Sequence, residues 1–568
     1  MNWFYHKDCF LQILIIAGRQ SVWFDEQYNK SGWLPVTIPG AWDHYNMAYW
    51  GYEGVAWYSL TCPWQSEWSD TQQFLHLQRI GGHAKVWVNG YWIGEHIGSY
   101  MPCRYDITSH LRTDLVNQIV IRVDNVPKEH WLPGGLLIEW MQYGGLIQPV
   151  TIESKSMCMI DDCTVQAIPY QLGEHAEVNC VIKLSQSGME PFEGELQADI
   201  VIHNKKYSAY IEVAVQPGQQ QQEYKLTIAT GAVELWSPDT PYLYDLKVHL
   251  ADNDKQIYDE RSLRLGFRTI EVREREICLN GKPLLIKGVN RYDEVAGYGT
   301  TVPEDVIRAD LMKIKLTGAN CIRTHYPQDP IHLQIMDEIG LLQIEELPLN
   351  WWLKPWEPEA EVDEVLHNGI IDTAEAFMPQ WIHSRSHHPC VIMWSMCNES
   401  GTNKPYGIEA VRRLMRRARE LDPTRLVSFV AIGHTEGHEA FQEADVVCIN
   451  LYYGSVIAPL AYHIDELAEC AAEPTAKHLQ QMRERFPDKP LVVTEFGMQA
   501  VAGMHGDQRY AETFHAAYIA SVWEAIRSVE GVQGGVIWSW ADYHHRRTLI
   551  GEWPVPFGPG FFPARMTD

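Results

Sequence analysis

The pattern of hydrophobic and polar positions divides the chain into three stretches. In the first, from about residue 23 to residue 154, short alternating runs are separated by turn residues, and no helical periodicity is sustained. The run at 84–88 stops at the dipeptide Asn89-Gly90, and alternation resumes at 91–94. An Asn-Gly pair between two such runs is typical of a β-hairpin. We therefore predict an all-β domain in this stretch.

The second stretch, from about residue 159 to residue 266, also alternates with a period of two. The alternation is clearest in residues 176–184, 195–203 and 244–250. The length of the stretch and its series of short strands predict a β-sandwich of immunoglobulin size.

The third stretch, after Val272, combines helix and strand signals. Apolar residues at helical spacing, such as Ile307, Leu311 and Ile314, alternate with short continuous apolar runs. This alternation is typical of βα units around a parallel sheet, and eight units predict a (β/α)8 barrel. The eight predicted strands are 284–289, 319–323, 341–345, 391–396, 426–430, 445–449, 491–494 and 535–539. The expected domains are 1–154, 155–270 and 271–568.

Composition and charge narrow the class of ligand. A chain of 568 residues with 46% hydrophobic content is long enough for two to four folded domains. The formal net charge of -27 argues against nucleic acid and anionic membranes as partners, because both require clustered Lys and Arg. No apolar run reaches the ~18 residues needed to span a bilayer. An uncharged or locally recognised substrate fits this balance better.

The cysteine pattern favours a cytoplasmic protein. Twelve cysteines are spread along the chain without a CxxC pair, which fits neither a disulfide-rich secreted module nor a zinc knuckle. A short signal peptide at 9–17 (CFLQILIIA) is the alternative. Asp8 precedes that stretch, Gln12 interrupts it and no A-x-A site follows, so we expect a reducing cytosol.

Two carboxylates are expected at one end of the barrel. Chemistry in such barrels takes place at the C-terminal ends of the strands. The fourth predicted strand is followed by Glu399 and the seventh by Glu495. A retaining glycoside hydrolase needs one carboxyl to protonate the leaving oxygen and a second, ~5 Å away, to attack the anomeric carbon. A salt bridge or helix cap is the alternative for each Glu alone, but two behind apolar strands favour catalysis.

Other strand ends carry residues suited to a sugar. Aromatic side chains cover the apolar face of a sugar ring and polar groups bind its hydroxyls. Most of the 22 tryptophans are nevertheless expected to serve ordinary cores. The residues of this kind are Arg323, His325 and Tyr326 after the second strand, Asn450, Tyr452 and Tyr453 after the sixth, and Trp538, Trp540 and Asp542 at the eighth.

Several motifs along nearly the whole chain resemble glycoside hydrolase family two, which contains β-galactosidases, β-glucuronidases and β-mannosidases. One group resembles the sugar-binding jelly roll of that family: 39–42 (PGAW), 54–58 (GVAWY), 88–90 (VNG) and 142–145 (QYGG). A second group resembles the start of its barrel: 266–268 (GFR), 279–283 (LNGKP) and 287–291 (KGVNR). The implied fold is multidomain, with a β jelly roll, an immunoglobulin-like sandwich and a TIM barrel.

The resemblance also implies roles for individual residues. Glu399 matches the acid/base of the family, Glu495 its nucleophile, and Asn398 the residue that binds the sugar 2-hydroxyl. Glu139 matches an acidic residue that reaches the barrel from the jelly roll. The predicted substrate-binding residues are Asn398, Arg323, His325, Tyr452, Tyr453, Trp538, Glu139, Asp293 and Arg546. The expected enzyme is a retaining exo-β-glycosidase.

Specificity stays open between a β-galactoside and a β-glucuronide, with a β-galacturonide as a further alternative. The segment 494–505 is most similar to the β-glucuronidase branch. The Asn-x-Lys motif by which that branch binds a uronate does not occur between 542 and 568. Arg546 and Arg547 would bind a carboxylate, although a solvated basic pair is the alternative. Tyr292 stands where the family usually has His, which changes the expected pocket.

We expect no metal and no required cofactor. His434 and His438 have helical spacing, but the Glu of a HExxH site is missing, so surface histidines are expected. A homo-oligomer is left open. Relatives often continue beyond 557–560 into a last helix, and a barrel with a shortened last helix would depend on a partner subunit for stability. The alternative from another class is a non-catalytic carbohydrate-binding protein, against which the paired carboxylates argue.

Overall fold

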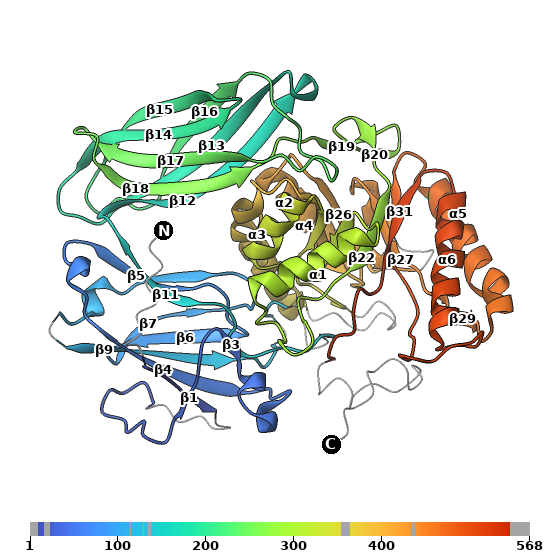
Figure 1. Cartoon of the computed structure of the whole chain (residues 1–568), viewed down its shortest axis with the longest axis horizontal. Coiled ribbons are helices and arrows are strands. Elements are labelled where there is room, and N and C mark those ends of the chain that lie inside the picture. Colours follow the sequence, from blue (N-terminus) through green and yellow to red (C-terminus); the bar gives the residue numbers. More distant parts are fainter. Residues whose placement is uncertain are drawn as a thin grey trace.

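The chain folds into three bodies, as the sequence predicts (Figure 1). Two β-rich bodies lie one above the other on the left, and a barrel surrounded by helices lies on the right. The barrel contacts both β bodies. The computed structural model describes residues 10–15, 23–113, 115–128, 130–133, 138–353, 364–433 and 438–545.

The first body is a jelly roll whose core lies between two sheets. Tyr58 and Leu75, from opposite sheets, are both fully buried in this core. Asn89 and Gly90 both have positive φ, so the predicted hairpin is confirmed. The larger sheet has the order β2 (Leu34–Pro35), β1 (Phe10–Ile15), β4 (Val55–Pro63), β9 (Val116–Asp124), β6 (His83–Val88), β7 (Tyr91–His96). The other sheets are β11 (Val150–Lys155), β5 (Gln72–Leu77), β8 (Cys103–Asp106), and the pair β10 (Gly145–Leu146), β3 (Gly40–Ala41).

The second body is the predicted sandwich. Alternate residues such as Val178 and Leu196 point into one apolar core between its sheets. The Trp236 indole donates to the carbonyl of Asp337 (2.8 Å), which fixes the sandwich to the barrel. One sheet has β12 (Cys158–Tyr170), β13 (His175–Gln186) and β16 (Gln222–Thr230). The other has β15 (Lys205–Val215), β14 (Phe192–Ile202), β17 (Tyr244–Asp252) and β18 (Ile257–Leu265).

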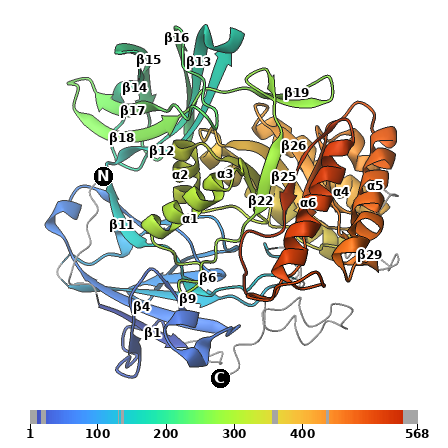
Figure 2. The same ribbon diagram turned by 45° about the vertical axis from the view of Figure 1, so that its right-hand side comes forward.

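Eight parallel strands close the third body into a barrel, which confirms the eight predicted strands (Figure 2). The last begins three residues before its predicted start, so Trp538 follows that strand. A small sheet of β19 (Ile270–Arg273), β20 (Glu276–Leu279) and β21 (Lys282–Pro283) precedes the barrel. The barrel strands are β22 (Ile286–Asn290), β23 (Cys321–Arg323), β24 (Leu342–Glu346), β25 (Val391–Asn398), β26 (Leu426–Ile432), β27 (Val447–Asn450), β30 (Leu491–Phe496) and β31 (Val532–Ile537).

Helices surround the barrel (Figure 2). Ile307, Leu311 and Ile314 form the buried face of the first, as their spacing predicts. No helix in the described part of the chain is long and apolar enough to cross a membrane. The helices are α1 (Glu304–Leu316), α2 (Pro330–Ile339), α3 (Glu364–Arg385), α4 (Pro405–Leu421), α5 (Glu473–Arg485) and α6 (Glu512–Ser528), and a two-stranded β28 (Tyr453–Gly454) and β29 (Ile457–Leu460) precedes α5.

A buried ion pair joins the jelly roll to the barrel. The guanidinium of Arg79 contacts Asp293 (2.5 Å), in the loop after β22, and Asp329 (3.0 Å), just before α2. All three side chains are almost inaccessible to water. Removal of one partner from such a buried pair costs about 3–5 kcal/mol, so the pair fixes how the jelly roll meets the barrel mouth.

Candidate active site

Glu399 follows β25 directly and is 8% exposed. Both of its carboxyl oxygens accept hydrogen bonds, Oε1 from Asn450 Nδ2 (2.9 Å) and Oε2 from Trp351 Nε1 (3.0 Å). Burial raises the pKa of Glu399 to about 7, helped by the charge of Glu495 and opposed by these hydrogen bonds. This carboxyl can therefore hold a proton near neutral pH.

Glu495 lies in β30 and is 5% exposed. Its Oε1 accepts hydrogen bonds from Arg323 Nη1 (2.7 Å) and contacts His325 Nε2 (3.2 Å), and Oε2 accepts one from the Tyr452 hydroxyl (2.6 Å). Burial favours the neutral form, but these donors and the positive charges outweigh it and hold the pKa at about 2. Glu495 is thus an anion at any ordinary pH.

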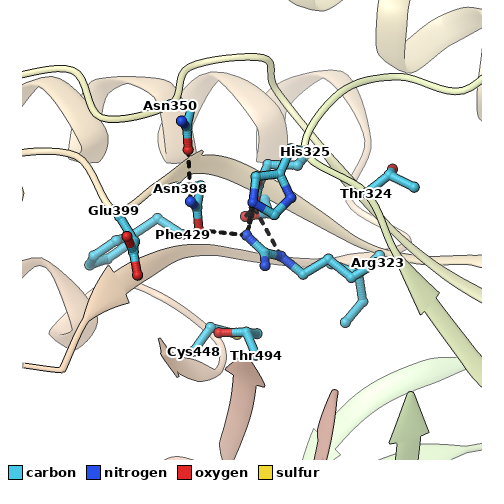
Figure 3. Close-up of polar contacts among 12 residues, drawn as sticks. Arg323, Thr324, His325, Asn350, Asn398, Glu399, Phe429, Cys448 and Thr494 are labelled. Carbon is cyan, nitrogen blue, oxygen red and sulfur yellow. Dashed lines mark hydrogen bonds and ion pairs between the residues drawn. The ribbon is translucent and has the colours of Figure 1, made fainter. Parts of the chain in front are cut away.

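The two carboxyls belong to one polar network. Asn450 donates both to Glu399 and to Asn398 Oδ1 (3.2 Å), and the same oxygen accepts a bond from Arg323 Nη2 (2.8 Å). Arg323 then reaches Glu495. Figure 3 shows Asn398 between Asn350 and Arg323, with Glu399 beside it. A proton-holding carboxyl and an ionised one at one barrel mouth are the pair that retaining glycoside hydrolysis requires.

Arg323 is held rigidly beneath this network. It is fully buried, and its Nη2 donates to both carboxylate oxygens of Glu346, at 2.9 and 3.0 Å. Asn290 Oδ1 accepts a further bond from it (2.9 Å). Because each neighbour is itself at a strand end, Arg323 presents Nη1 to Glu495 in one orientation. The described contacts of Arg323 are all with side chains of the protein, and Nη1 faces Glu495.

A third buried carboxyl, Glu139, enters the site from the jelly roll. It accepts a hydrogen bond from the Tyr543 hydroxyl, and the Tyr543 ring stacks on Tyr292 with centroids 3.8 Å apart. Burial raises the pKa of Glu139 to about 8, and the charges of Glu495 and Glu399 contribute. Glu139 is therefore mainly a neutral acid at pH 7.

The predicted aromatic residues are placed differently from one another. Tyr452 contacts Glu495, and Trp538 lies edge-on to Tyr452 with centroids 6.4 Å apart. Tyr453 instead hydrogen-bonds through its hydroxyl to His478 in α5 (3.0 Å) and packs against the barrel core. This placement does not support the predicted substrate contact of Tyr453.

Asp293 serves the domain junction and not the paired carboxyls. Besides Arg79, it accepts a bond from the Tyr326 hydroxyl (2.7 Å). The predicted substrate contact of Asp293 has no support in this arrangement. Tyr292, the neighbouring residue, packs against His325, with ring centroids 5.4 Å apart. Arg546 and residues 557–560 lie outside the described residues.

The structure gives the possible metal ligands other roles. His438 is 1% exposed, so the expectation of a surface histidine is wrong there, and His434 lies outside the described residues. Asp337, His388 and Cys390 are the single group of three possible ligands in the described part of the chain. Asp337 already pairs with His388 (2.5 Å) and accepts the backbone N–H of Cys390 (3.0 Å). These contacts explain the group as a buried polar network.

Sequence reasoning missed Trp351 and Tyr543 as site residues. Trp351 lies five residues beyond β24, where a strand-end rule does not reach. Tyr543 contacts the site only because residues 543–545 run beside the jelly-roll loop, where Met141 N donates to the His544 carbonyl (2.8 Å). Clustered aromatics near strand ends were the available signal for both residues.

Comparison with protein-family models gives one family for all three bodies. Residues 270–553 match "Glycosyl hydrolases family 2, TIM barrel domain". Residues 158–268 match "Glycosyl hydrolases family 2", and residues 10–151 match its "sugar binding domain". The three matched segments coincide with the jelly roll, the sandwich and the barrel, in that order along the chain.

Known proteins similar to the chain include three kinds of enzyme. A β-glucuronidase of Paenibacillus borealis is 27% identical over 93% of this chain and 88% of its own length. A β-galactosidase of Psychromonas ingrahamii is 24% identical over 91% of this chain, which spans 48% of that protein. A β-galacturonidase structure from Eisenbergiella tayi, bound to galacturonate, matches with a TM-score of 0.80 at 21% identity. The match includes 96% of this chain and 90% of that chain.

Proposed function

Because the chain belongs to glycosyl hydrolases family 2 and is a glycoside hydrolase, we propose that Glu399 and Glu495 cleave terminal β-D-glycosides with retention. The resemblance inferred from the sequence is thereby confirmed at the level of the family. One observation carries the roles: Glu399 accepts hydrogen bonds from neutral donors, Asn450 and Trp351, whereas Glu495 faces Arg323 and His325. Burial therefore raises the pKa of Glu399 to about 7, while these donors and charges hold that of Glu495 at about 2. The first matches an acid and the second a nucleophile.

The proposed reaction has two steps. In the first, Glu495 attacks the anomeric carbon while Glu399 gives its proton to the glycosidic oxygen, so the aglycone leaves and a glycosyl ester forms on Glu495. In the second, the Glu399 carboxylate takes a proton from water as that water attacks the anomeric carbon and the ester bond breaks. Arg323, His325 and Tyr452 orient Glu495 and stabilise its charge when it leaves.

The alkaline limb of the pH profile tests the acid role of Glu399. For an aryl glycoside with a poor leaving group, kcat/KM is expected to fall as pH rises through about 7, because Glu399 loses the proton that it must donate. Glu495, with a pKa of about 2, stays ionised through the acid range. The measurement is kcat/KM against pH at constant ionic strength.

A matched substrate separates Glu399 from Glu139 in that profile. The aglycone of a 2,4-dinitrophenyl glycoside leaves as an anion and needs no proton. The kcat/KM of this substrate is therefore expected to lack the limb near pH 7. If the limb persists with this substrate, the acid role of Glu399 is contradicted. Glu139→Gln then shows whether the third carboxyl, with its pKa of about 8, causes the limb.

The terminal sugar is the open part of the proposal. The relatives named above act on a glucuronide, a galactoside and a galacturonide. A uronate carboxylate requires a cation, and Arg323 and His325 are both engaged with Glu495. A neutral β-galactoside needs no such cation. Among the described residues, the contacts of Arg323 and His325 with Glu495 therefore favour a galactoside. Arg546 stays a sequence prediction for the uronide case.

A panel of aryl β-glycosides decides between these sugars. We expect the galactoside to exceed the glucuronide and galacturonide in kcat/KM by at least about tenfold, the ratio that ~1.4 kcal/mol of differential binding gives. Turnover of a uronide alone would contradict this preference. In that case Arg546→Ala is expected to raise KM for the uronide without changing the pH profile, and Arg547→Ala is the matched control.

A further inference from the structure

The loop after β24 is joined by backbone hydrogen bonds to the residues that carry the acid/base. Asn398 N donates to the Leu349 carbonyl (3.0 Å), Trp351 N donates to the Asn398 carbonyl (3.1 Å), and Gly401 N donates to the Trp352 carbonyl (2.7 Å). The segment 349–352 therefore runs beside 398–401 on both sides of Glu399, and the position of one segment fixes the other.

Within this pairing, the Trp351 side chain is directed at the acid/base. Its indole Nε1 donates to Glu399 Oε2 at 3.0 Å, while Asn450 occupies Oε1. Both Trp351 (φ 51°) and Glu399 (φ 42°) have left-handed backbone conformations, which residues other than glycine rarely adopt. Such conformations are strained and persist where the surrounding structure requires them, often at functional sites.

We propose that Trp351 is a positioning residue that fixes the Glu399 carboxyl and stabilises its ionised form for the second step of the reaction. The proposal rests on the proposed acid/base role of Glu399. In the first step Glu399 gives up its proton and becomes an anion, and in the second it must act as a carboxylate base on water. The indole N–H transfers no proton in either step, and its hydrogen bond to a charged oxygen is strongest when Glu399 is ionised.

This role differs from that of an aromatic wall for the sugar. A stacking surface contributes to binding and changes KM when it is altered. A donor to the acid/base changes the pH at which Glu399 gains or loses its proton. Hydrogen bonding to the charged form lowers a pKa, so loss of the Trp351 N–H moves the Glu399 titration to higher pH.

Trp351→Phe removes the N–H and keeps an aromatic ring. We expect the alkaline limb of kcat/KM for a poor leaving group to move up by about one pH unit, the shift that corresponds to loss of one hydrogen bond to a charged group. With a dinitrophenyl glycoside, kcat is limited by the second step, and its acidic limb is expected to move up by the same amount. Trp92→Phe, on the exposed edge of the jelly roll, is the matched control and is expected to shift neither limb.

A double-mutant cycle shows whether the effect passes through Glu399. In a Glu399→Ala background, Trp351→Phe is expected to change the dinitrophenyl rate by less than about twofold, because the group on which Trp351 acts is absent. A raised KM with unshifted limbs, or an undiminished effect in the Glu399→Ala background, would overturn the proposal. Failure of the Trp351 proposal can be told apart from failure of the acid/base role of Glu399. If Glu399 is not the acid/base, added azide will not restore the activity of Glu399→Ala.

A second measurement needs no substitution of Trp351. In protein labelled with 5-fluorotryptophan, we expect one fluorine resonance to titrate with the midpoint of the Glu399 limb. That resonance is expected to be fixed in Glu399→Gln, which cannot ionise. If no tryptophan resonance loses its titration in Glu399→Gln, Trp351 does not sense the acid/base and the proposal is wrong.

Discussion

Glu495→Gln is expected to lower kcat by on the order of 10⁴-fold or more on every glycoside that the enzyme accepts. The amide keeps the size of the side chain but cannot attack the anomeric carbon. It also leaves Arg323 and His325 without the anion that they face in the native site, at 2.7 and 3.2 Å. Because Arg323 keeps its pair with Glu346, the fold is expected to persist and the loss to appear in kcat. It is measured under saturating substrate, with the melting temperature as a check.

Glu139→Gln is the matched control for this substitution. Glu139 is buried at the same mouth, and a neutral amide resembles its protonated acid, since burial raises its pKa to about 8. We expect less than about a tenfold change in kcat, within the range of one neutral hydrogen bond. A residual rate above about one-hundredth of wild type in Glu495→Gln would contradict the nucleophile assignment. A loss of kcat in Glu139→Gln that is larger than the loss in Glu495→Gln would also contradict it.

The intermediate itself provides a further check on Glu495. A 2-fluoro sugar with a good leaving group slows the second step more than the first, so a glycosyl ester accumulates on the nucleophile. Peptide mass spectrometry is expected to locate the added sugar on the fragment with Glu495. A label on Glu399 or Glu139 would reverse the proposed roles.

The barrel and its paired carboxyls were accessible to sequence reasoning because both depend on local pattern. A parallel strand covered on both faces appears as a short apolar run, and each of the eight predicted runs forms a strand of the closed barrel. Closure of the barrel then brings the C-terminal ends of the strands to one mouth. Glu399 and Glu495 follow from that geometry without any knowledge of side-chain orientation.

The remaining site residues depend on orientation, which strand ends do not reveal. Adjacent residues in an extended chain point to opposite faces. Tyr452 reaches Glu495 while Tyr453 turns to His478. Trp351 also escapes the pattern, since its approach to Glu399 comes from a loop that continues beyond β24 beside the end of β25.

Glu399→Ala is expected to divide substrates by their leaving groups. For a phenyl glycoside, which needs the proton of Glu399, kcat/KM should fall roughly 10²- to 10⁴-fold, the usual contribution of general acid catalysis. A dinitrophenyl glycoside should lose much less in kcat/KM, because its aglycone leaves as an anion. Its kcat should still fall, since hydrolysis of the ester on Glu495 then lacks a base.

Azide resolves that second loss, because it is an anion that attacks the glycosyl ester without needing a base. Added azide is expected to restore kcat of Glu399→Ala on the dinitrophenyl glycoside and to yield a β-glycosyl azide, the product of two inversions at the anomeric carbon. An α-azide would mean a single displacement and no ester on Glu495. Equal losses for both leaving groups would mean that Glu399 holds the site together rather than donating a proton, since only proton donation depends on the leaving group.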